Sequence, residues 1–473
     1  MRISSITAND VHGTLRFDSK YHISRKNPLL DGLRSSRWPM KSIGETFGKD
    51  KIWTGNIFSR VYAPSPEHGK PLLVPYDLFR YIPWSDKILS RSQVAQFSRL
   101  EVKRGWLFIV CSGRNLGPIT IADAFCEQFT MSHDMVRIAV EPTPELFYLA
   151  AFLSTKHGQA TIRTDMNGSV IDHTDEHKIA AIRYPLVDTE VKNLCATLFQ
   201  QGFEKRERAR ILLAETKLRF ADHFSLTTAE QGFGPKELSR RFTRFRSQFK
   251  DRFDAEPFAP RYAAWQEVIS ARGGCMLSDI ASVQKPASRY KTNYVDDEQY
   301  GVKMMNGRQI AQYRPIALRL MSMSAFKNPD VFQLQEGMTL LTADGRAEEN
   351  LADCALITED REGWAASGHV HRVMPNPGVH PGLVYLACSC EPVQAQLKSL
   401  ATGSVVDALS ESDVASVTVP YETSTEALEI GDTAQKAWSL FAEASHAENE
   451  AIATLEAELS SGGVDSESLR IRM

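Results

Sequence analysis

The stretch Gly168-Ser169-Val170-Ile171-Asp172 returns about 235 residues later as Gly403-Ser404-Val405-Val406-Asp407. Other residues return in the same order with nearly the same shift: Arg16-Phe17-Asp18 as Arg252-Phe253-Asp254, Gly113-Arg114 as Gly345-Arg346, Ser132 and Arg137 as Ser367 and Arg372, and Pro185 as Pro420. This shift is far longer than the 20–50 residues of a solenoid repeat. The pattern therefore predicts two similar domains, each with its own connector.

The composition is that of ordinary globular domains. The chain has 473 residues, of which 42% are hydrophobic and 24% charged, and its net charge is −3. This length is typical of two to four domains. No apolar run is long enough for a membrane span, and the N-terminus lacks the apolar core of a signal peptide. The seven scattered cysteines lack zinc spacing and favour reduced thiols in a cytoplasmic protein.

Each half shows short β-type runs followed by a long helical pattern, and this mixed order predicts an α+β fold. In the first half we expect a strand at 106–110, a turn at 112–115, a helix at 147–153 ending near Gly158, and a strand at 179–184. In the second half we expect a strand at 338–341, a turn at 344–346, a helix at 384–400 and a strand at 414–419.

Two long helices are predicted, near residues 188–222 and 424–460. In the second, Trp438, Phe441, Ser445, Glu448, Ile452, Leu455 and Leu459 alternate three and four apart, like a heptad seam. Segment 203–219 is basic and segment 443–458 is acidic. Opposite charge favours pairing of the two helices within the chain, although each could instead pack on its own domain. Approximate twofold symmetry would make the pair antiparallel, as a spacer between the two domains.

These patterns divide the chain into four predicted segments. Residues 1–187 form a first domain, and 188–235 a first spacer helix with its connector. Residues 236–422 form a basic helix and the second domain, and 423–473 a second spacer helix with a tail. Within 236–252, Arg240, Arg244 and five further basic residues alternate with phenylalanines at helical spacing. This stretch is either a solvated basic face or a surface that contacts phosphates or a partner.

Catalytic motifs are missing from the sequence. It has no P-loop, HExxH, Gly-x-Ser-x-Gly or dinucleotide-binding glycine motif. Neither His369-Val370-His371 nor His133-Asp134 has the partners that a metal site or a nucleophile needs. We therefore expect a protein that is not an enzyme and has no metal or cofactor of its own.

A large duplicated chain without catalytic motifs favours recognition, and DNA sequence is recognised by Arg, Lys, Asn or Gln side chains that reach base edges. The loops of both halves supply such residues. The candidate DNA-contacting residues are Arg114, Asn115, Lys285, Arg289, Lys291, Arg308, Gln309, Arg346, Arg240 and Arg244.

The ordered motifs resemble those of the specificity (S) subunits of type I restriction-modification systems. The segments Arg16-Phe17-Asp18-Ser19-Lys20-Tyr21 and Arg252-Phe253-Asp254 are similar to the opening motif of each repeat. The strand and turn from Gly105 to Arg114, the Tyr148-Leu149 and Tyr385-Leu386 helices, and the Gly168-Ser169 and Gly403-Ser404 segments are similar to its later motifs. Asp344 in place of Ser112 and Pro257 in place of an aromatic residue depart from the pattern.

The resemblance implies a bipartite DNA-recognition subunit. Each of two target-recognition domains would bind one half of a split site, and the helices would set the distance between the halves. Two copies of a DNA adenine methyltransferase subunit, which carry the S-adenosylmethionine, would dock on the helices, and a restriction subunit could join. Three alternatives remain at this point: a DNA-recognition subunit of another phage-defence or modification system, a coiled-coil scaffold that binds protein only, and a duplicated enzyme with its active site in a cleft between the two halves. The missing catalytic motifs argue against the enzyme.

Overall fold

The computed structural model describes residues 19–164, 172–226, 260–286, 290–326, 328–347, 349–403 and 406–462. Several predicted residues lie outside these ranges: Arg16, Asp18, Gly168, Ser169, Arg240, Arg244, Arg252, Asp254, Arg289 and Ser404. The chain divides into two compact units. Unit 1 comprises the residues up to Glu207 and those from Glu443 onward, and unit 2 comprises Arg208–Ala442.

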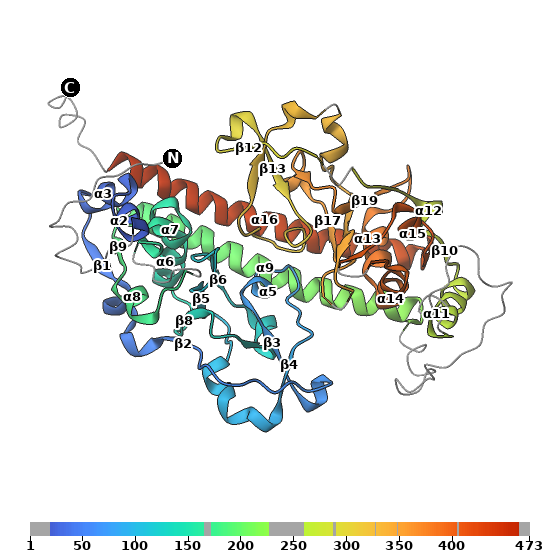
Figure 1. Ribbon diagram of the computed structural model, residues 1–473, viewed down its shortest axis with the longest axis horizontal. Coiled ribbons are helices and arrows are strands. Elements are labelled where there is room, and N and C mark those ends of the chain that lie inside the picture. The colour runs from blue at the N-terminus through green and yellow to red at the C-terminus, as the bar shows by residue number, and fades with distance from the viewer. Residues whose placement is uncertain are drawn as a thin grey trace. The chain divides into compact units, whose positions relative to one another are not determined.

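Two long helices contribute to both units. They are α9 (Thr189–His223) and α16 (Thr425–Ser461), drawn in green and red in Figure 1. The boundary between the units falls inside each helix, so each unit contains one part of α9 and one part of α16. The two units are described separately below.

Unit 1 begins with short helices and continues with small sheets. Its further elements are α2 (Ser19–Arg25), α3 (Pro28–Arg34), β1 (Met40–Ser42), α4 (Ile43–Phe47), η1 (Lys49–Lys51), β2 (Ile52–Thr54), η2 (Pro66–His68), β3 (Gly69–Leu73), α5 (Pro75–Leu78), β4 (Ile88–Ser90), η3 (Arg91–Leu100), β5 (Leu107–Val110), β6 (Ile119–Ile121), η4 (Ala124–Gln128), β7 (Thr130–Met131), β8 (Met135–Ile138), α6 (Pro144–Ser154), α7 (Lys156–Ile162), α8 (Glu176–Ala181) and β9 (Arg183–Pro185).

Three sheets organise unit 1. The largest has the strand order β2-β8-β5-β6 and is antiparallel throughout. A second sheet has the order β4-β3-β7, with β3 and β7 parallel, and a third pairs β1 with β9. Helix α6 is buried along Leu146–Leu153, as expected for a helix that is apolar on all sides. It belongs to a core that also includes the inner faces of β5 and β8 and the residues Phe199 and Leu455.

Unit 2 follows a similar order of elements. They are α11 (Pro260–Ala271), β10 (Cys275–Met276), α12 (Leu277–Ile280), β11 (Ala281–Gln284), β12 (Tyr294–Val295), η7 (Glu298–Tyr300), β13 (Val302–Met305), β14 (Arg319–Met321), η8 (Met323–Ala325), η9 (Pro329–Phe332), β15 (Thr339–Thr342), β16 (Asp344–Gly345), β17 (Cys354–Leu356), η10 (Glu359–Arg361), β18 (Ala365–Ala366), β19 (Val370–Pro375), α13 (Pro381–Ser389), α14 (Glu391–Leu400), β20 (Asp407–Ala408), α15 (Glu411–Ala415) and β21 (Thr418–Val419).

The sheets of unit 2 have the same topology as those of unit 1. The order β11-β19-β15-β17 corresponds to β2-β8-β5-β6, and β14-β13-β18 corresponds to β4-β3-β7, again with one parallel pair. Strand β12 is added at the edge of the sheet β14-β13-β18, and β10 pairs with β21 as β1 pairs with β9. Strands β16 and β20 form a further two-stranded sheet where unit 1 has the isolated bridge Ser112–His173. The repeat predicted from the sequence is therefore a repeat of the fold, and the α+β class is confirmed.

Side-chain contacts repeat as well. Gln159 Nε2 donates to the carbonyl oxygens of Gly117 and Leu153 at 2.9 and 2.7 Å. Gln394, 235 positions later, donates at 2.9 and 2.8 Å to those of Ala352 and Cys388, which follow Gly117 and Leu153 by the same 235 positions. The duplicated units thus share hydrogen bonds as well as strand order.

Within unit 1, α9 and α16 pair in antiparallel directions, because Cys195 lies against Ala451 while Lys205 bonds Glu443 at 2.6 Å. The helices approach closely at Gly202, where an added Cβ would lie 2.6 Å from Glu448 Cγ. Arg206 and Glu448 form a hydrogen-bonded ion pair, and their side chains are only 2% and 3% exposed. The predicted pairing of the basic with the acidic segment is confirmed here.

Within unit 2, α16 packs against α13 through aromatic side chains. Trp438 is buried and makes an edge contact with Tyr385, with ring centroids 5.1 Å apart. At the end of α9, His223 Nε2 lies 2.5 Å from Glu422 Oε1. Along α16 as a whole, five residues of the predicted seam are buried (Trp438, Phe441, Glu448, Leu455 and Leu459), whereas Ser445 and Ile452 are only partly buried.

Several local predictions were wrong. Residues 179–184 and 414–419 do not form continuous strands: each region begins with a short helix, α8 or α15, and ends with a short strand. Capping explains the difference, because Asp175 and Ser410 accept hydrogen bonds from the backbone N–H groups of Lys178 and Asp413.

The other corrections concern two helical regions. The helix predicted to end near Gly158 ends at Ser154, and Gly158 lies inside α7. The helix predicted at 384–400 is two helices, α13 and α14, which are separated at Cys390. All seven cysteines are free of disulfides. Over the described residues, no helix is long and apolar enough to cross a membrane.

Candidate nucleic-acid interface

Three connecting segments of unit 1 form what we call loop cluster 1. They are the short helix α5, the turn 112–115 after β5, and the turn 132–134 between β7 and β8. Asn115 Nδ2 donates to the hydroxyl of Tyr76 at 2.7 Å, which joins the first two loops. The third joins them because Cys111 N donates to the carbonyl oxygen of Asp134 at 2.9 Å. Arg114 and Tyr76 are both exposed.

A histidine stands at the tip of the third loop. His133 Nδ1 lies 2.9 Å from an Arg60 guanidinium nitrogen, and His133 Nε2 lies 3.6 Å from Asp134 Oδ1. All three groups are polar and near the surface, and nothing in their arrangement supplies a nucleophile. The pair His133–Asp134 therefore contributes polar surface to loop cluster 1.

The same three loops of unit 2 form loop cluster 2: residues 306–309, 344–347 and 367–369. Ala343 N donates to the carbonyl oxygen of His369 at 3.0 Å, which matches the bond between Cys111 and Asp134 in unit 1. An added Cβ on Gly307 would lie 3.1 Å from Thr342 Cγ2 and 3.9 Å from the His369 carbonyl oxygen, which places the first loop beside the other two.

The side chains of loop cluster 2 differ from those of loop cluster 1. Asp344 Oδ2 lies 2.5 Å from His369 Nδ1, and Asp344 Oδ1 lies 4.0 Å from Lys285 Nζ. Arg346 is 63% exposed and lies 3.7 Å from Glu349. The sequence departure at Asp344 thus creates a charged cluster, while the backbone pairing is kept: Asp344 pairs with Ala408 as Ser112 pairs with His173 in unit 1.

The described sequence candidates are exposed, partly buried or buried, and Asn115, which donates to Tyr76, is among the partly buried ones. Arg114, Arg308, Lys291 and Arg346 are exposed on loops. Lys285 is partly buried against Asp344, and its backbone N–H donates to Glu411.

Gln309 is a correction to the sequence candidates. It is 5% exposed, its Oε1 accepts from Asn306 N at 2.9 Å, and its Nε2 donates to the Ile316 carbonyl oxygen at 2.7 Å. Its amide holds its own loop together, so we exclude it from the candidate interface.

Other residues of the clusters escaped the sequence analysis as surface candidates. Tyr76, Arg60 and His369 join the clusters through contacts with residues 39, 73 and 25 positions away. Tyr76 and His369 lie in the repeated loops, which is their sequence signal, whereas Arg60 lies in none of these loops and has no such signal. Unit 1 also exposes apolar side chains around its smaller sheet, among them Ile57 (80% exposed), Tyr62 and Trp84.

The pair His369 and His371 forms no metal site. His371 is fully buried, and its Nε2 lies 3.1 Å from the Leu409 carbonyl oxygen, whereas His369 is directed to Asp344. Burial, reinforced by Lys285, lowers the pKa of His371 to about 4 and keeps its ring neutral. Among the described residues, no group of three or more His, Cys, Asp or Glu side chains could hold a metal ion.

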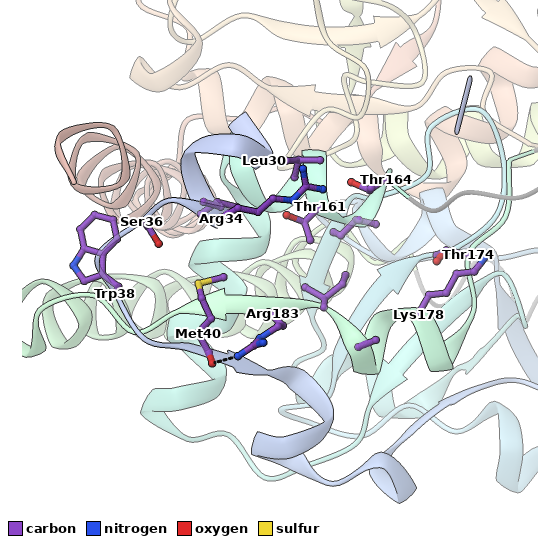
Figure 2. A pocket seen from close by; sticks show the side chains of 14 residues that line it. Leu30, Arg34, Ser36, Trp38, Met40, Thr161, Thr164, Thr174, Lys178 and Arg183 are labelled. Atoms are coloured by element: carbon purple, nitrogen blue, oxygen red, sulfur yellow. Dashed lines mark hydrogen bonds between the residues drawn. The ribbon is translucent and has the colours of Figure 1, made fainter. Parts of the chain in front are cut away.

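Unit 1 also contains a cavity of about 650 Å³ bounded by residues of α3, α7, α8 and β9. Figure 2 shows hydroxyl and basic side chains around it, including Thr161, Arg34 and Lys178. Arg183 is already engaged, since it donates to the Met40 carbonyl oxygen at 2.8 Å. No residue of loop cluster 1 lines this cavity, so it is a feature separate from the candidate interface.

No protein-family model and no curated protein matches the chain. Among solved structures, the chain is similar to the type I restriction-modification S subunit from M. genitalium, with 12% identity, a TM-score of 0.32, and 91% of this chain and 97% of that chain covered. It is also similar to the HsdS subunit from Thermoanaerobacter tengcongensis, with 13% identity, a TM-score of 0.26, and coverage of 90% and 96%. A third similar chain comes from a structure concerned with complex assembly and conformational transition of the type I R-M system, with 13% identity, a TM-score of 0.27, and coverage of 90% and 97%.

Proposed function

We propose that this chain is the DNA-recognition subunit of a type I restriction-modification complex, in which each unit binds one half of a bipartite target. One observation carries the proposal: two units of the same topology present the same three loops, built on matching main-chain bonds but bearing different side chains. A shared scaffold with divergent loops suits the recognition of two different half-sites. The motifs that resemble those of S subunits support the same conclusion.

The chemistry of the loops suits double-stranded DNA. Arg114, Arg308 and Arg346 are exposed, and arginine donates in a fork that matches the O6 and N7 acceptors of guanine. Asn115, held by Tyr76 in unit 1, could pair with adenine in the same way. Lys291 and Arg60 would contact phosphates, which position a protein on the duplex without specifying its sequence.

The long helices would be the binding surface for the partner subunits. In this proposal, two copies of an adenine methyltransferase subunit dock on them and carry the S-adenosylmethionine, while this chain itself catalyses nothing. A restriction subunit completes the complex. The paired helices would also set the distance between the two half-sites, because they are long and pair in antiparallel directions.

The test is selection of DNA from a randomised duplex library by the full chain assembled with its methyltransferase subunit. We expect a split motif with a constant gap, and affinity that falls steeply as salt rises. Arg114→Ala should relax one position of one half-site, at a cost of about 1–3 kcal/mol in discrimination.

The matched control is Lys51→Ala, which removes an exposed cation at the end of η1, beside Ile52 and thus at the end of the β2–β8 pair that lies away from the turn 132–134. It should leave the motif unchanged. An assembled complex that binds the methyltransferase but enriches no sequence would instead indicate a scaffold that binds protein only.

A further inference from the structure

One buried arginine occupies the same position in both units. Arg137 in β8 is fully buried, and Arg372 in β19 is 3% exposed. Arg137 donates to the carbonyl oxygens of Met135 (3.0 Å), Met131 (2.6 Å) and Ser132 (3.3 Å). These acceptors lie two, six and five residues before the arginine.

Arg372 makes the same set of bonds in unit 2. It donates to the carbonyl oxygens of Val370 (2.6 Å), Ser367 (3.1 Å) and Ala366. These acceptors again lie two, five and six residues before it. Each guanidinium reaches one more carbonyl oxygen from a distant segment, that of Glu101 at 3.5 Å or that of Phe332 at 3.2 Å.

These hydrogen bonds lie at the junction between two sheets of each unit. Strand β7 belongs to the smaller sheet of unit 1 and β8 to the larger one, so the turn 132–134 is a junction between the two sheets. The same holds for β18, β19 and the turn 367–369 in unit 2. Each arginine therefore connects both sheets and fixes the turn that carries His133 or His369 into its loop cluster.

Only an arginine side chain can donate to all of these carbonyl oxygens at once. A guanidinium offers five N–H donors in a rigid plane, whereas a lysine offers one compact ammonium group. Burial lowers the pKa of both arginines to about 10, so each stays charged at neutral pH and forms charge-assisted bonds to the turn.

We propose that Arg137 and Arg372 are positioning residues for DNA recognition, and that each governs the discrimination of one half-site by holding the turn of its own loop cluster. The inference rests on the proposed function for its DNA consequence. Its structural consequence, the ordering of each turn, is independent of DNA.

The test uses Arg137→Lys and Arg372→Lys in the full chain, so that each variant is the control for the other. The first measurement is amide hydrogen exchange without DNA. Arg137→Lys should speed exchange at 132–134 by about tenfold or more and leave 367–369 unchanged, and Arg372→Lys should do the reverse. Unchanged exchange at the mutated turn would overturn the proposal.

The second measurement is methylation of randomised duplexes by each variant assembled with the methyltransferase subunit. We expect each variant to relax one half-site only, and a different one. Equal relaxation of both half-sites, or weaker binding with full discrimination, would overturn the proposal. The unsubstituted complex separates the two hypotheses: if it selects no split motif, the proposed function fails, whereas the exchange experiment still decides whether the arginines order the turns.

A milder variant guards against unfolding of the mutated unit. Phe108 lies under the Arg137 guanidinium at 5.5 Å, and leucine occupies the corresponding position, Leu340, in unit 2. Phe108→Leu should therefore fold and shift exchange at 132–134 in the same direction by a smaller factor. No change in exchange with this variant and with Arg137→Lys would overturn the role of the guanidinium.

Discussion

Replacement of Glu448 by leucine should strongly destabilise unit 1. Glu448 and Arg206 are paired between α16 and α9 with side chains 3% and 2% exposed, so removal of the carboxylate leaves the guanidinium buried without it. Breaking such a pair on one side typically costs about 3–5 kcal/mol. The exposed pair Lys205–Glu443 is a control in the same helices, because its side chains are 38% and 47% exposed, and Glu443→Ala should cost at most about 1 kcal/mol.

The repeat suggests how to rescue the loss. At the positions of unit 2 that correspond to Arg206 and Glu448 with a shift of 236, the chain has Ala442 and Leu212. The double variant Arg206→Ala/Glu448→Leu should therefore recover most of the stability, since an apolar pair replaces a buried ion pair at little cost.

The assay is guanidinium unfolding of the full chain, of Arg206→Ala, Glu448→Leu and their double variant as a double-mutant cycle, and of the control Glu443→Ala. Amide exchange in residues 195–206 assigns the loss of stability to unit 1. A cost below about 1 kcal/mol for Glu448→Leu, or a double variant as unstable as the sum of Arg206→Ala and Glu448→Leu, would refute the buried pair as a determinant of helix pairing.

Two further predictions concern stability. Because the pKa of His371 falls from 6.5 to about 4 on folding, its neutral ring should contribute about 3 kcal/mol that is present above pH 6.5 and is lost as the pH falls toward 4. His371→Gln, which can still donate to Leu409, should flatten this dependence in denaturation curves measured from pH 7 to 4. Gly202→Ala should lower the stability by about 1–3 kcal/mol, because its Cβ would meet Glu448 and Ala444. Gly32→Ala is the control, because Gly32 lies in a helix and no atom lies within 4 Å of the added Cβ. It should raise the stability by up to about 1 kcal/mol. Both variants are compared by the midpoint of thermal unfolding, and equal effects would contradict the close approach of α9 and α16 at Gly202.

Periodicity over many residues predicted the long elements well. The helices expected near 188–222 and 424–460 span Thr189–His223 and Thr425–Ser461, because one turn after another repeats the same burial pattern. Short elements were harder to predict. Residues 179–184 read as a strand from their apolar character, but a single cap at Asp175 is enough to begin a helix there.

The loop clusters could be predicted only in outline. The repeat located the turns at 112–115 and 344–346, and Arg114 and Arg346 do lie exposed on them. The contacts that complete the clusters join distant residues, such as Tyr76 with Asn115 and Arg60 with His133, and no local pattern encodes them. Gln309 was misassigned for the same reason, since its partner Ile316 becomes apparent only in the folded loop.

The most direct test of a duplicated DNA-recognition subunit is sequencing of adenine methylation in cells that express the methyltransferase subunit with or without this chain. Our account predicts a split motif that appears only with the chain, and that changes in one half alone when the exposed loop residues of one unit, such as Arg308 and Arg346, are replaced. Methylation that is independent of the chain, or a single continuous motif altered equally by substitutions in either unit, would contradict it.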